Sequence, residues 1–414
     1  MLKKINPALE RYIIILYLAI SGLIIGAVVG GIDAVFGIVL VKLNEIRELN
    51  FNMFIPFLAP VGLLIVYVYK KIGGKIYKGV NLVFEVDYGQ EEIIPKRFIP
   101  LLITGTWLTH LFGGSAGREG VAVQIGAAFS NWVGRKIPFP VMDRNKIFLV
   151  TGIAAGFAGL FGTPIAAIFF AMEVLIAGTL RYQALLPAVI AAFTASSVSQ
   201  RLGLNMFTYN LSSVVDFNLE NMIKISLLGV IFGLVGWIFA YSLKNIKKAL
   251  VKIFPNPYIR ILIMGIILSI LLFALHRGRY SGLSSSLMIN SFSGGEIYYY
   301  DWILKLLLTA TTLSIGFQGG EVAPMFIVGA TLGVVIAKYF NLPVEFVAAM
   351  GYVGVFGSGT NTFLAPIFVG GEIFGFEYIP YFFIVCSFAY IFNMNKSIYS
   401  LQRRSYDIYQ FERK

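Results

Sequence analysis

The stretch GREGVAVQIG, residues 117–126, places an arginine–glutamate pair between two apolar runs. A charged pair between membrane-type segments costs about 2.5–3.5 kcal/mol per group, so it is a candidate functional site. The glycines break the chain, and the helix that follows has free N–H groups and a positive dipole end that favour an anion. Two interpretations stay open at this point. Arg118 and Glu119 form either a helix cap with a snorkelling arginine or part of an anion site.

The composition is typical of a protein that crosses a membrane several times. Of the 414 residues, 57% are hydrophobic and 13% are charged, and the mean hydropathy is +0.79. The net charge of +12 comes largely from short basic clusters at 70–78, 244–252 and 403–404. Such clusters are expected in cytoplasmic loops, so they indicate orientation rather than nucleic-acid binding. We therefore predict a multi-pass protein of the cell inner (plasma) membrane, with no nucleic-acid partner.

Enzyme, metal and cofactor chemistry has little support in the sequence. His110 and His276 stand far apart, and no group of Cys, His and Asp residues has metal-ligand spacing. Cys386 is the single cysteine, so an intramolecular disulfide is excluded. We predict that the chain is not an enzyme and that it uses neither a metal nor a cofactor.

The apolar runs predict an all-α protein whose helices are tilted or broken. Residues 12–43 form one long run and residues 55–69 a second, whereas residues 70–97 have the composition of a polar cytoplasmic loop. Several later runs, such as 121–134 and 361–374, are shorter than the roughly 20 residues that a straight span needs. Broken helices are tolerated in a membrane where they line an aqueous path. The pattern therefore favours a transport site built from helix ends.

A shift of 199 residues places motifs of the first half of the chain on motifs of the second. It superimposes residues 117–123 on 316–322, and it places Glu173 on Glu372. Two inverted repeats would point two helix N-termini at one site near the membrane midplane. Facing N-termini present backbone N–H groups and positive dipole ends, so the predicted substrate is an anion.

The repeat also predicts how the chain is divided. We expect a first transmembrane repeat at residues 1–205, a connecting loop at 206–221, and a second transmembrane repeat with a short cytoplasmic tail at 222–414.

At this point the motifs resemble those of one family. GREG with QIG, at residues 117–126, resembles the GREGPxVQIG motif of the CLC chloride channel and transporter superfamily. Residues 152–173, 316–325 and 397–400 resemble three further motifs of that family, in the same order. The resemblance covers nearly the whole chain. It implies a CLC-type fold of two inverted repeats, a homodimer in the lipid bilayer, and an anion pathway in each subunit.

The resemblance also implies roles for single residues. Glu119 matches the gating glutamate, whose carboxylate occupies an anion site and leaves it when protonated. This is physically reasonable, because protonation removes the charge that holds the carboxylate there. Tyr399 matches a tyrosine whose hydroxyl donates to the central anion. The full set of implied anion-binding residues is Val80, Asn81, Gly120, Val121, Ala122, Val123, Glu321, Val322, Ala323 and Tyr399.

Departures from the family pattern indicate which ion is carried. Val121 stands where chloride-handling members usually have proline, and GVNLV at residues 79–83 stands where they have GSGIP, so that either Val80 or Asn81 replaces a serine. Val174 stands where chloride/proton exchangers commonly carry an inner glutamate. These changes together resemble the bacterial fluoride/proton antiporters of the superfamily, although those members often have threonine in place of Ala323.

The leading prediction is therefore a fluoride/proton antiporter that exports fluoride and gives fluoride resistance. The alternative is a chloride or nitrate transporter, or a passive anion channel, of the same superfamily. The predicted partners are fluoride or chloride, protons, a second copy of the chain and the lipid bilayer.

Four other residues have two interpretations each. Glu173 and Glu372 are expected to bond to helix ends or to lie at the dimer interface. His110 is a proton relay or a core histidine, and Arg118 is expected to pair with a carboxylate or a helix end.

Overall fold

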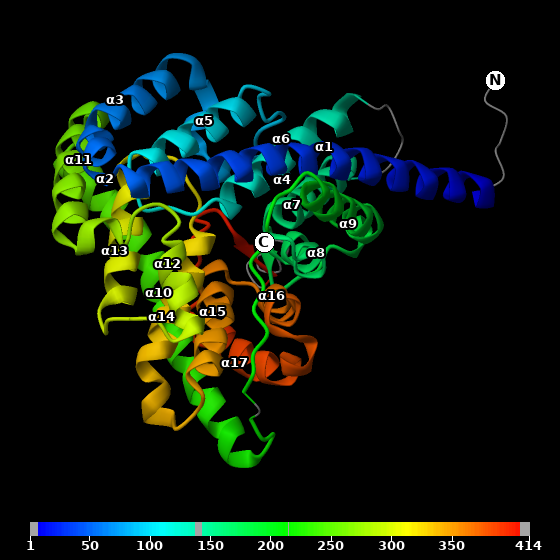
Figure 1. Ribbon diagram of the computed structural model, residues 1–414. Helices are drawn as coiled ribbons and strands as arrows, with labels where there is room; N and C mark the ends of the chain where they lie inside the picture. Colours follow the sequence, from blue (N-terminus) through cyan, green and yellow to red (C-terminus); the bar gives the residue numbers. More distant parts are fainter. Residues whose placement is uncertain (1–6, 137–142, 214, 406–414) are drawn as a thin grey trace, which may run out of the picture.

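Helices account for most of the computed structural model, which describes residues 7–136, 143–213 and 215–405 (Figure 1). The charged tail at residues 406–414 lies outside the described residues. Six helical segments in the described part of the chain are long and apolar enough to cross a membrane. Shorter apolar helices accompany them, which confirms the prediction of a multi-pass helical protein. The six segments are Arg11–Leu49, Phe51–Lys78, Tyr182–Arg201, Leu219–Ile253, Pro257–Ala274 and Val322–Phe340.

The first half of the chain is broken more often than its hydropathy suggests. The run at 55–69 is divided among several short helical pieces, and the predicted loop at 70–97 contains a helix. That helix forms because Gly79, at a φ of +57°, turns the chain, and Leu82, Val83 and Phe84 then bury an apolar face. The prediction of an ordinary loop there was wrong. The bounds are α1 Pro7–Leu49, α2 Phe51–Phe54, η1 Ile55–Phe57, α3 Leu58–Val68, η2 Tyr69–Gly73, η3 Gly74–Lys78, α4 Val80–Asp87, α5 Phe98–Leu111, α6 Glu119–Lys136, α7 Arg144–Phe161, α8 Pro164–Glu173, η4 Tyr182–Ala184 and α9 Leu185–Arg201.

The second half begins after residues 202–218, where the structure has no helix among the described residues. The predicted run at 361–374 corresponds to a separate helix, α16. The division into two repeats with a connecting loop stays a prediction. The bounds are α10 Leu219–Ile253, α11 Pro257–Ala274, η5 His276–Gly278, α12 Ser285–Ser293, α13 Asp301–Ile315, α14 Val322–Phe340, α15 Val344–Thr360, α16 Leu364–Phe374, η6 Phe376–Tyr378 and α17 Ile379–Ile391.

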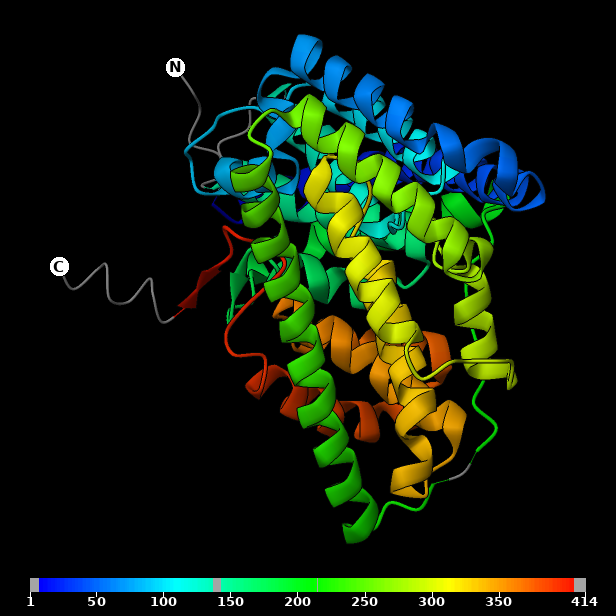
Figure 2. The same ribbon diagram turned by 90° about the vertical axis from the view of Figure 1, so that its left-hand side faces the viewer.

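Two segments cross between the halves. The first is α11 of the second half, which packs against α3 of the first half. Within the second half, α10 runs along α13 (Figure 2). The end of the chain returns to the first half, where β2 (Arg403–Arg404) pairs in parallel with β1 (Ile176–Ala177). The other β-pairing among the described residues consists of two isolated bridges, Ser115 with Gly282 and Gly117 with Gly320, so the prediction of an all-α fold is otherwise confirmed.

Two glutamates join the halves in a reciprocal way. The Glu173 carboxylate, at the end of α8, accepts hydrogen bonds of 2.8–3.2 Å from the N–H groups of Phe363 and Leu364 at the start of α16. The Glu372 carboxylate, on α16, accepts hydrogen bonds of 3.0 and 2.9 Å from the N–H groups of Ile165 and Ala166 at the start of α8. Each carboxylate satisfies helix N-terminal donors that would otherwise lack partners. The expectation that these residues bond to helix ends is confirmed.

Glycine pairs bring the helices of each half into backbone contact. A Cβ on Gly126 would lie 2.0 Å from the carbonyl oxygen of Gly152, and a Cβ on Gly329 would lie 2.0 Å from that of Gly351. The same contact therefore occurs between α6 and α7 and between α14 and α15. Such close approach of helices in a membrane requires small residues.

The residue of the second half that corresponds to Gly117 lies four positions, about one helical turn, from the predicted one. The structure pairs Gly117 with Gly320, four residues beyond Gly316, whereas Glu173 and Glu372 keep the offset of 199. The reason is the length of one connection. Residues 137–143 join α6 to α7, but residues 341–343 join α14 to α15, which is four residues fewer.

We predict that Gly126→Ala lowers the stability of the folded protein by about 1–3 kcal/mol or more, because the added methyl overpacks a backbone contact. Thermal unfolding in detergent, followed by size-exclusion chromatography, measures the effect. Gly31→Ala is the control, since a Cβ on Gly31 in α1 meets no atom within 4 Å. Equal melting temperatures for the two variants would contradict the prediction.

Candidate functional site

Two antiparallel backbone hydrogen bonds join the segments that precede α6 and α14. The N–H of Gly117 donates to the carbonyl of Gly320, and the N–H of Gly320 donates to the carbonyl of Gly117, both at 2.7 Å. A Cβ on Gly320 would lie 2.8 Å from the backbone nitrogen of Gly120, so a larger residue does not fit without movement. The pairing holds two helix N-termini next to each other. Their free N–H groups and dipole ends favour an anion at this junction.

The Glu119 side chain lies at the start of α14, where an anion would be held. Its Oε2 accepts hydrogen bonds from the N–H groups of Ala323 and Arg118, both at 3.2 Å. Its Oε1 lies 3.7 Å from Nε of Arg118. Glu119 is buried, with 3% of its surface exposed. The carboxylate is thus held by one donor from the other half of the chain, the N–H of Ala323, as well as by its neighbour Arg118, which favours the anion-site interpretation over a simple helix cap.

The predicted backbone ligands come together at this junction. The first turn of α6, from Gly120 to Val123, is buried, and a Cβ on Gly120 would lie 3.2 Å from Oε2 of Glu321 at the start of α14. The N–H groups of Val121 and Ala122 donate to the carbonyl of Arg118, at 3.1 and 3.2 Å, so these two predicted donors are already used in this conformation. Of the predicted ligands on α14, Val322 is buried, and Ala323 contacts Glu119 through its backbone N–H. The contact at Ala323 therefore does not depend on a threonine hydroxyl.

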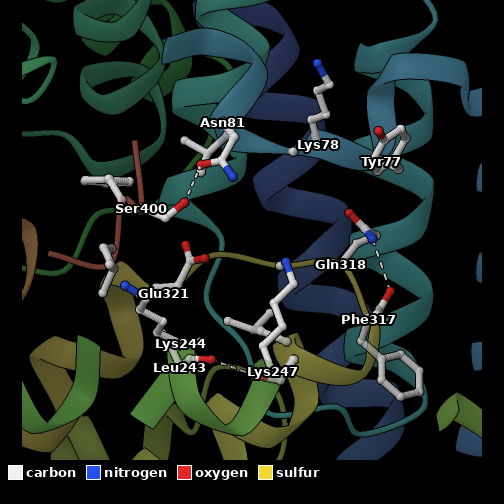
Figure 3. Close-up of a pocket in the computed structure, with 18 of the residues that line it drawn as sticks. Tyr77, Lys78, Asn81, Leu243, Lys244, Lys247, Phe317, Gln318, Glu321 and Ser400 are labelled. Atoms are coloured by element: carbon white, nitrogen blue, oxygen red, sulfur yellow. Dashed lines mark hydrogen bonds between the residues drawn. The ribbon is translucent and has the colours of Figure 1, made fainter. Parts of the chain in front are cut away.

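The remaining predicted ligands line a cavity of about 1110 Å³ (Figure 3). Val80 and Asn81 belong to the first turn of α4, and Tyr399 belongs to the segment that follows α17. The hydroxyl of Ser400 donates to Oδ1 of Asn81 at 3.1 Å. The Tyr399 ring is buried, with its centroid 5.5 Å from that of Phe84. Both Val80 and Asn81 therefore face the cavity, and the Asn81 carbonyl is held by Ser400.

The cavity is lined by more cations than anions. From the sequence, the lysines at 244–252 were interpreted as a sign of the orientation of the chain in the membrane. The structure also places two of them, Lys244 and Lys247 of α10, on the cavity wall (Figure 3). Neither lysine forms an ion pair within 4 Å among the described residues, although the charge of Lys247 acts on the carboxylate of Glu321. Such a wall raises the local concentration of anions. The basic residues that line the cavity are Lys70, Lys78, Lys244, Lys247, Arg260, Lys396 and Arg404.

Lys78 differs from these two lysines, because carboxylates neutralise it. Its Nζ lies 2.6 Å from Glu85 and 3.2 Å from Glu91. Glu91, in the connection between α4 and α5, is also bonded by the ammonium of Lys75, and this hydrogen bond holds the pKa of Glu91 below its usual value. Lys244 and Lys247 therefore contribute more of the free positive charge than Lys78.

Glu321 is an acidic residue of the cavity wall, and it lies between the cavity and Glu119. Its carboxylate points toward Ser400 in the cavity (Figure 3). It also faces Gly120, the residue after Glu119. From the sequence, only the backbone N–H of Glu321 was expected to contact the anion. The structure adds a titratable side chain beside the junction.

Val174, which stands at the position of the inner glutamate of chloride/proton exchangers, has no titratable side chain. It is buried, with 3% exposed, and its carbonyl accepts a hydrogen bond of 2.8 Å from Nε2 of Gln402. The same amide of Gln402 donates to the carbonyl of Thr360 at 3.0 Å. The side chain of Gln402 therefore covers this position.

His110 and Lys305 support the loop before Glu119 from the side of α5 and α13. Both are fully buried. Lys305 donates to Ser115 at 3.0 Å and to the carbonyl of Gly282 at 2.9 Å. Nδ1 of His110 lies 3.5 Å from the amide of Asn44, which favours the core-histidine interpretation over a relay. A charged residue within the apolar run at 302–315 is the sequence signal that could have identified Lys305.

Comparison with known proteins gives a consistent result. The family described as voltage gated chloride channel matches residues 57–394. The "Chloride/fluoride channel protein" of Pseudomonas syringae pv. tomato is 34% identical over 394 residues, which are 94% of this chain and 86% of that protein. The H(+)/Cl(-) exchange transporter ClcA of Yersinia pestis is 26% identical over 60% of this chain and 54% of its own length.

Two solved structures have a similar fold. A crystal structure of a CLC-type fluoride/proton antiporter is 49% identical, covers 94% of this chain and 98% of its own, and has a TM-score of 0.92. A slow cyanobacterial Cl⁻/H⁺ antiporter is 17% identical over 93% of this chain and 96% of its own, with a TM-score of 0.78. The second likeness concerns the fold alone.

We predict that the double variant Lys244→Gln/Lys247→Gln lowers anion flux from the cavity side several-fold at low ionic strength. The reason is the loss of the field that concentrates anions at the cavity wall. Proteoliposome flux is measured with increasing potassium sulfate. The difference from wild type should shrink near 0.1 M, where screening acts within about 10 Å. Lys248→Gln is the control, since Lys248 is exposed and does not line the cavity. A salt-independent loss would contradict this role.

Proposed function

The chain belongs to the voltage gated chloride channel family, the CLC superfamily, and we propose that it exports fluoride in exchange for protons. It is a multi-pass membrane protein, and its relatives are transporters of anions and protons. One observation carries the proposal. A titratable carboxylate, that of Glu119, accepts hydrogen bonds at a helix N-terminus where a substrate anion would bind.

The geometry supports an exchange cycle in which Glu119 competes with the anion. When ionised, its carboxylate is attracted to the N–H of Ala323 and to the dipole of α14. Protonation removes the charge that holds it, so the side chain leaves and fluoride takes its place. Loss of the proton on the other side of the membrane lets the carboxylate return and displace the ion. Each cycle therefore couples one movement of the anion to one movement of a proton on Glu119.

Glu321 is the group that we propose for proton transfer on the cavity side. It lines the cavity and faces Gly120, whereas Val174 is apolar and closed off by Gln402. A proton that reaches Glu321 from water in the cavity is therefore next to the junction that holds Glu119. This route needs no inner glutamate at position 174.

Fluoride rather than chloride is supported by the residues around the junction and by two relatives. Fluoride is small and accepts strong hydrogen bonds, so its site needs donors at close range, and the reciprocal pairing of Gly117 and Gly320 brings the two backbones together. Val121 stands where chloride-handling members have proline, and either Val80 or Asn81 stands where they have serine. A relative described as a chloride/fluoride channel protein and a structure described as a fluoride/proton antiporter agree with this choice.

The assembly and the location are also proposals. We propose a homodimer in the cell inner (plasma) membrane, as the family resemblance implies. The junction at Glu119 and the cavity are built from residues of one chain. Each copy would therefore carry its own pathway.

Purified protein in proteoliposomes tests the proposal. With fluoride loaded inside, we expect fluoride efflux to acidify the interior, and we expect a proton gradient alone to drive fluoride uphill. An ion-selective electrode measures fluoride, and an internal dye measures pH. Chloride that moves as fast as fluoride would overturn the fluoride assignment. Fluoride efflux without proton movement would leave a passive channel.

Glu119→Gln tests the role of the gate. Because glutamine cannot carry the proton, we expect fluoride-driven proton movement to fall to the level of empty liposomes. Glu321→Gln should slow proton movement without abolishing fluoride binding, which isothermal titration calorimetry measures. Glu45→Gln is the control, because Glu45 is an exposed acid on α1. Coupled flux that persists at the wild-type level in Glu119→Gln would remove the role given to Glu119.

A further inference from the structure

Gln124, on α6 one turn after Gly120, has an amide oxygen without a partner. Its Nε2 donates a hydrogen bond of 3.0 Å to the carbonyl of Gly120. Its Oε1 is buried and accepts no hydrogen bond from the described residues, and only 6% of the residue is exposed. A buried acceptor without a donor is destabilising, so nearly every such atom in a folded protein receives a hydrogen bond from protein, water or ligand. No step of the proposed transport cycle uses this atom.

The hydrogen bond to Gly120 fixes which amide atom of Gln124 is free. Rotating the amide by half a turn would exchange the nitrogen and the oxygen, which are alike in shape. The rotated oxygen would then face the carbonyl oxygen of Gly120, and two acceptors repel each other. The free atom is therefore the oxygen, which can accept a hydrogen bond but cannot donate one.

The free oxygen lies where the start of α4 approaches α6. Gln124 lines the cavity, and a Cβ on Gly79 would lie 3.9 Å from its Oε1. Gly79 precedes the first turn of α4, which brings Val80 and Asn81 to the same cavity wall. The oxygen of Gln124 is therefore directed at the part of the cavity that also contains the predicted anion ligands of α4.

The polarity of this oxygen excludes the substrate anion as its partner. An amide oxygen carries a partial negative charge, so it repels fluoride and chloride and accepts hydrogen bonds from O–H or N–H donors. A buried water needs roughly two to four polar partners, and a cavity of about 1110 Å³ with polar side chains on its wall has room for one. The donor that fits the oxygen of Gln124 is therefore a water molecule.

Glu321 is the second partner for such a water. A Cβ on Gly120 would lie 3.2 Å from Oε2 of Glu321, and the carbonyl of Gly120 is the group that holds the amide of Gln124. The two side chains therefore approach the same residue, and both line the cavity, into which the carboxylate of Glu321 points (Figure 3). Among the described residues, the other charged side chains of this wall are basic, so they donate hydrogen bonds and cannot accept one.

We propose that Gln124 is a positioning residue for the transported proton, because its Oε1 and the carboxylate of Glu321 hold one bridging water between them. This inference rests on the proposed antiport and on the role proposed for Glu321. A proton that arrives from the cavity converts this water to a hydronium ion, which then gives a proton to a carboxylate oxygen of Glu321. The carboxylate becomes neutral, the water is restored, and the glutamine is unchanged.

The same arrangement keeps the bridging water away from the anion. A water molecule has two hydrogens, and here one is directed at Gln124 and the other at Glu321. Neither hydrogen is then available to fluoride, which accepts strong hydrogen bonds and would otherwise compete for this water. Gln124 thereby gives the proton and the anion different partners within one cavity.

Crystal structures of the wild-type protein, at a resolution that shows ordered water, test the proposal directly. We expect a peak about 2.8 Å from both Oε1 of Gln124 and a carboxylate oxygen of Glu321. Fluoride and water scatter X-rays alike, so crystals with and without fluoride are compared, and the peak should be present in both. The absence of a peak, or a peak that appears only with fluoride, would overturn the proposal.

Gln124→Met tests the role in transport, because methionine has a similar volume and no amide oxygen. We expect fluoride-driven proton movement in proteoliposomes to slow by about three- to tenfold, as the loss of one hydrogen bond allows. Fluoride binding, measured by calorimetry, should stay at the wild-type level. Gln90→Met is the matched control, since Gln90 is an exposed glutamine that does not line the cavity.

A double variant separates positioning from a merely structural role. If Gln124 acts through Glu321, Gln124→Met/Glu321→Gln should be no slower than Glu321→Gln alone, whereas independent losses would multiply. A wild-type rate in Gln124→Met would overturn the proposal, and so would a double variant that is slower than Glu321→Gln. Should Gln124→Met not fold, the wild-type crystal structures decide the proposal by themselves.

Failure of this inference can be told apart from failure of the proposed function. A Glu321→Gln variant that moves protons at the wild-type rate would overturn the inference but leave antiport through Glu119 intact. If the wild-type protein itself does not couple fluoride to protons, the proposed function fails, which is a separate result.

Discussion

The reciprocal hydrogen bonds between Gly117 and Gly320 are the constraint on which the site depends. They fix the starts of α6 and α14 against each other, so the Glu119 of one half meets the Ala323 N–H of the other. Neither helix start alone would hold an anion inside a membrane against the cost of removing it from water. Two of them in contact provide donors and dipole ends on both sides. The glycines are required there because any side chain would separate the two backbones.

Much of this arrangement could be predicted from particular residues. The charged pair at Arg118 and Glu119 indicated the junction, because it interrupts two apolar runs. Glu173 and Glu372, which stand in apolar runs at the same offset, indicated the reciprocal contact of α8 and α16. The register at Gly117 was wrong by four residues, since the difference in length lies in a connection whose sequence has no periodic pattern. The helix α4 was missed for a similar reason, because eight residues between polar neighbours carry little hydropathy signal.

Side-chain groupings across the two halves could not be predicted. Lys244 and Lys247 lie on a cavity wall with Asn81 and Tyr399, which are far away in the sequence. The amide of Gln402 closes the position at Val174 from the opposite end of the chain. Lys305 stands alone in an apolar run, and this anomaly was available in the sequence. What it contacts depends on tertiary packing, which a single sequence does not specify.

The caps exchanged between α8 and α16 limit how the protein can move. Four backbone N–H groups donate to two carboxylates that belong to the opposite half. Hydrogen bonds to charged groups contribute about 1.5–3 kcal/mol each, so rocking one half against the other would break a set that is expensive to lose. The two halves are therefore held as one rigid frame. We therefore expect ions to change sides through the rotation of single side chains, such as that of Glu119, and not through rocking of the two halves.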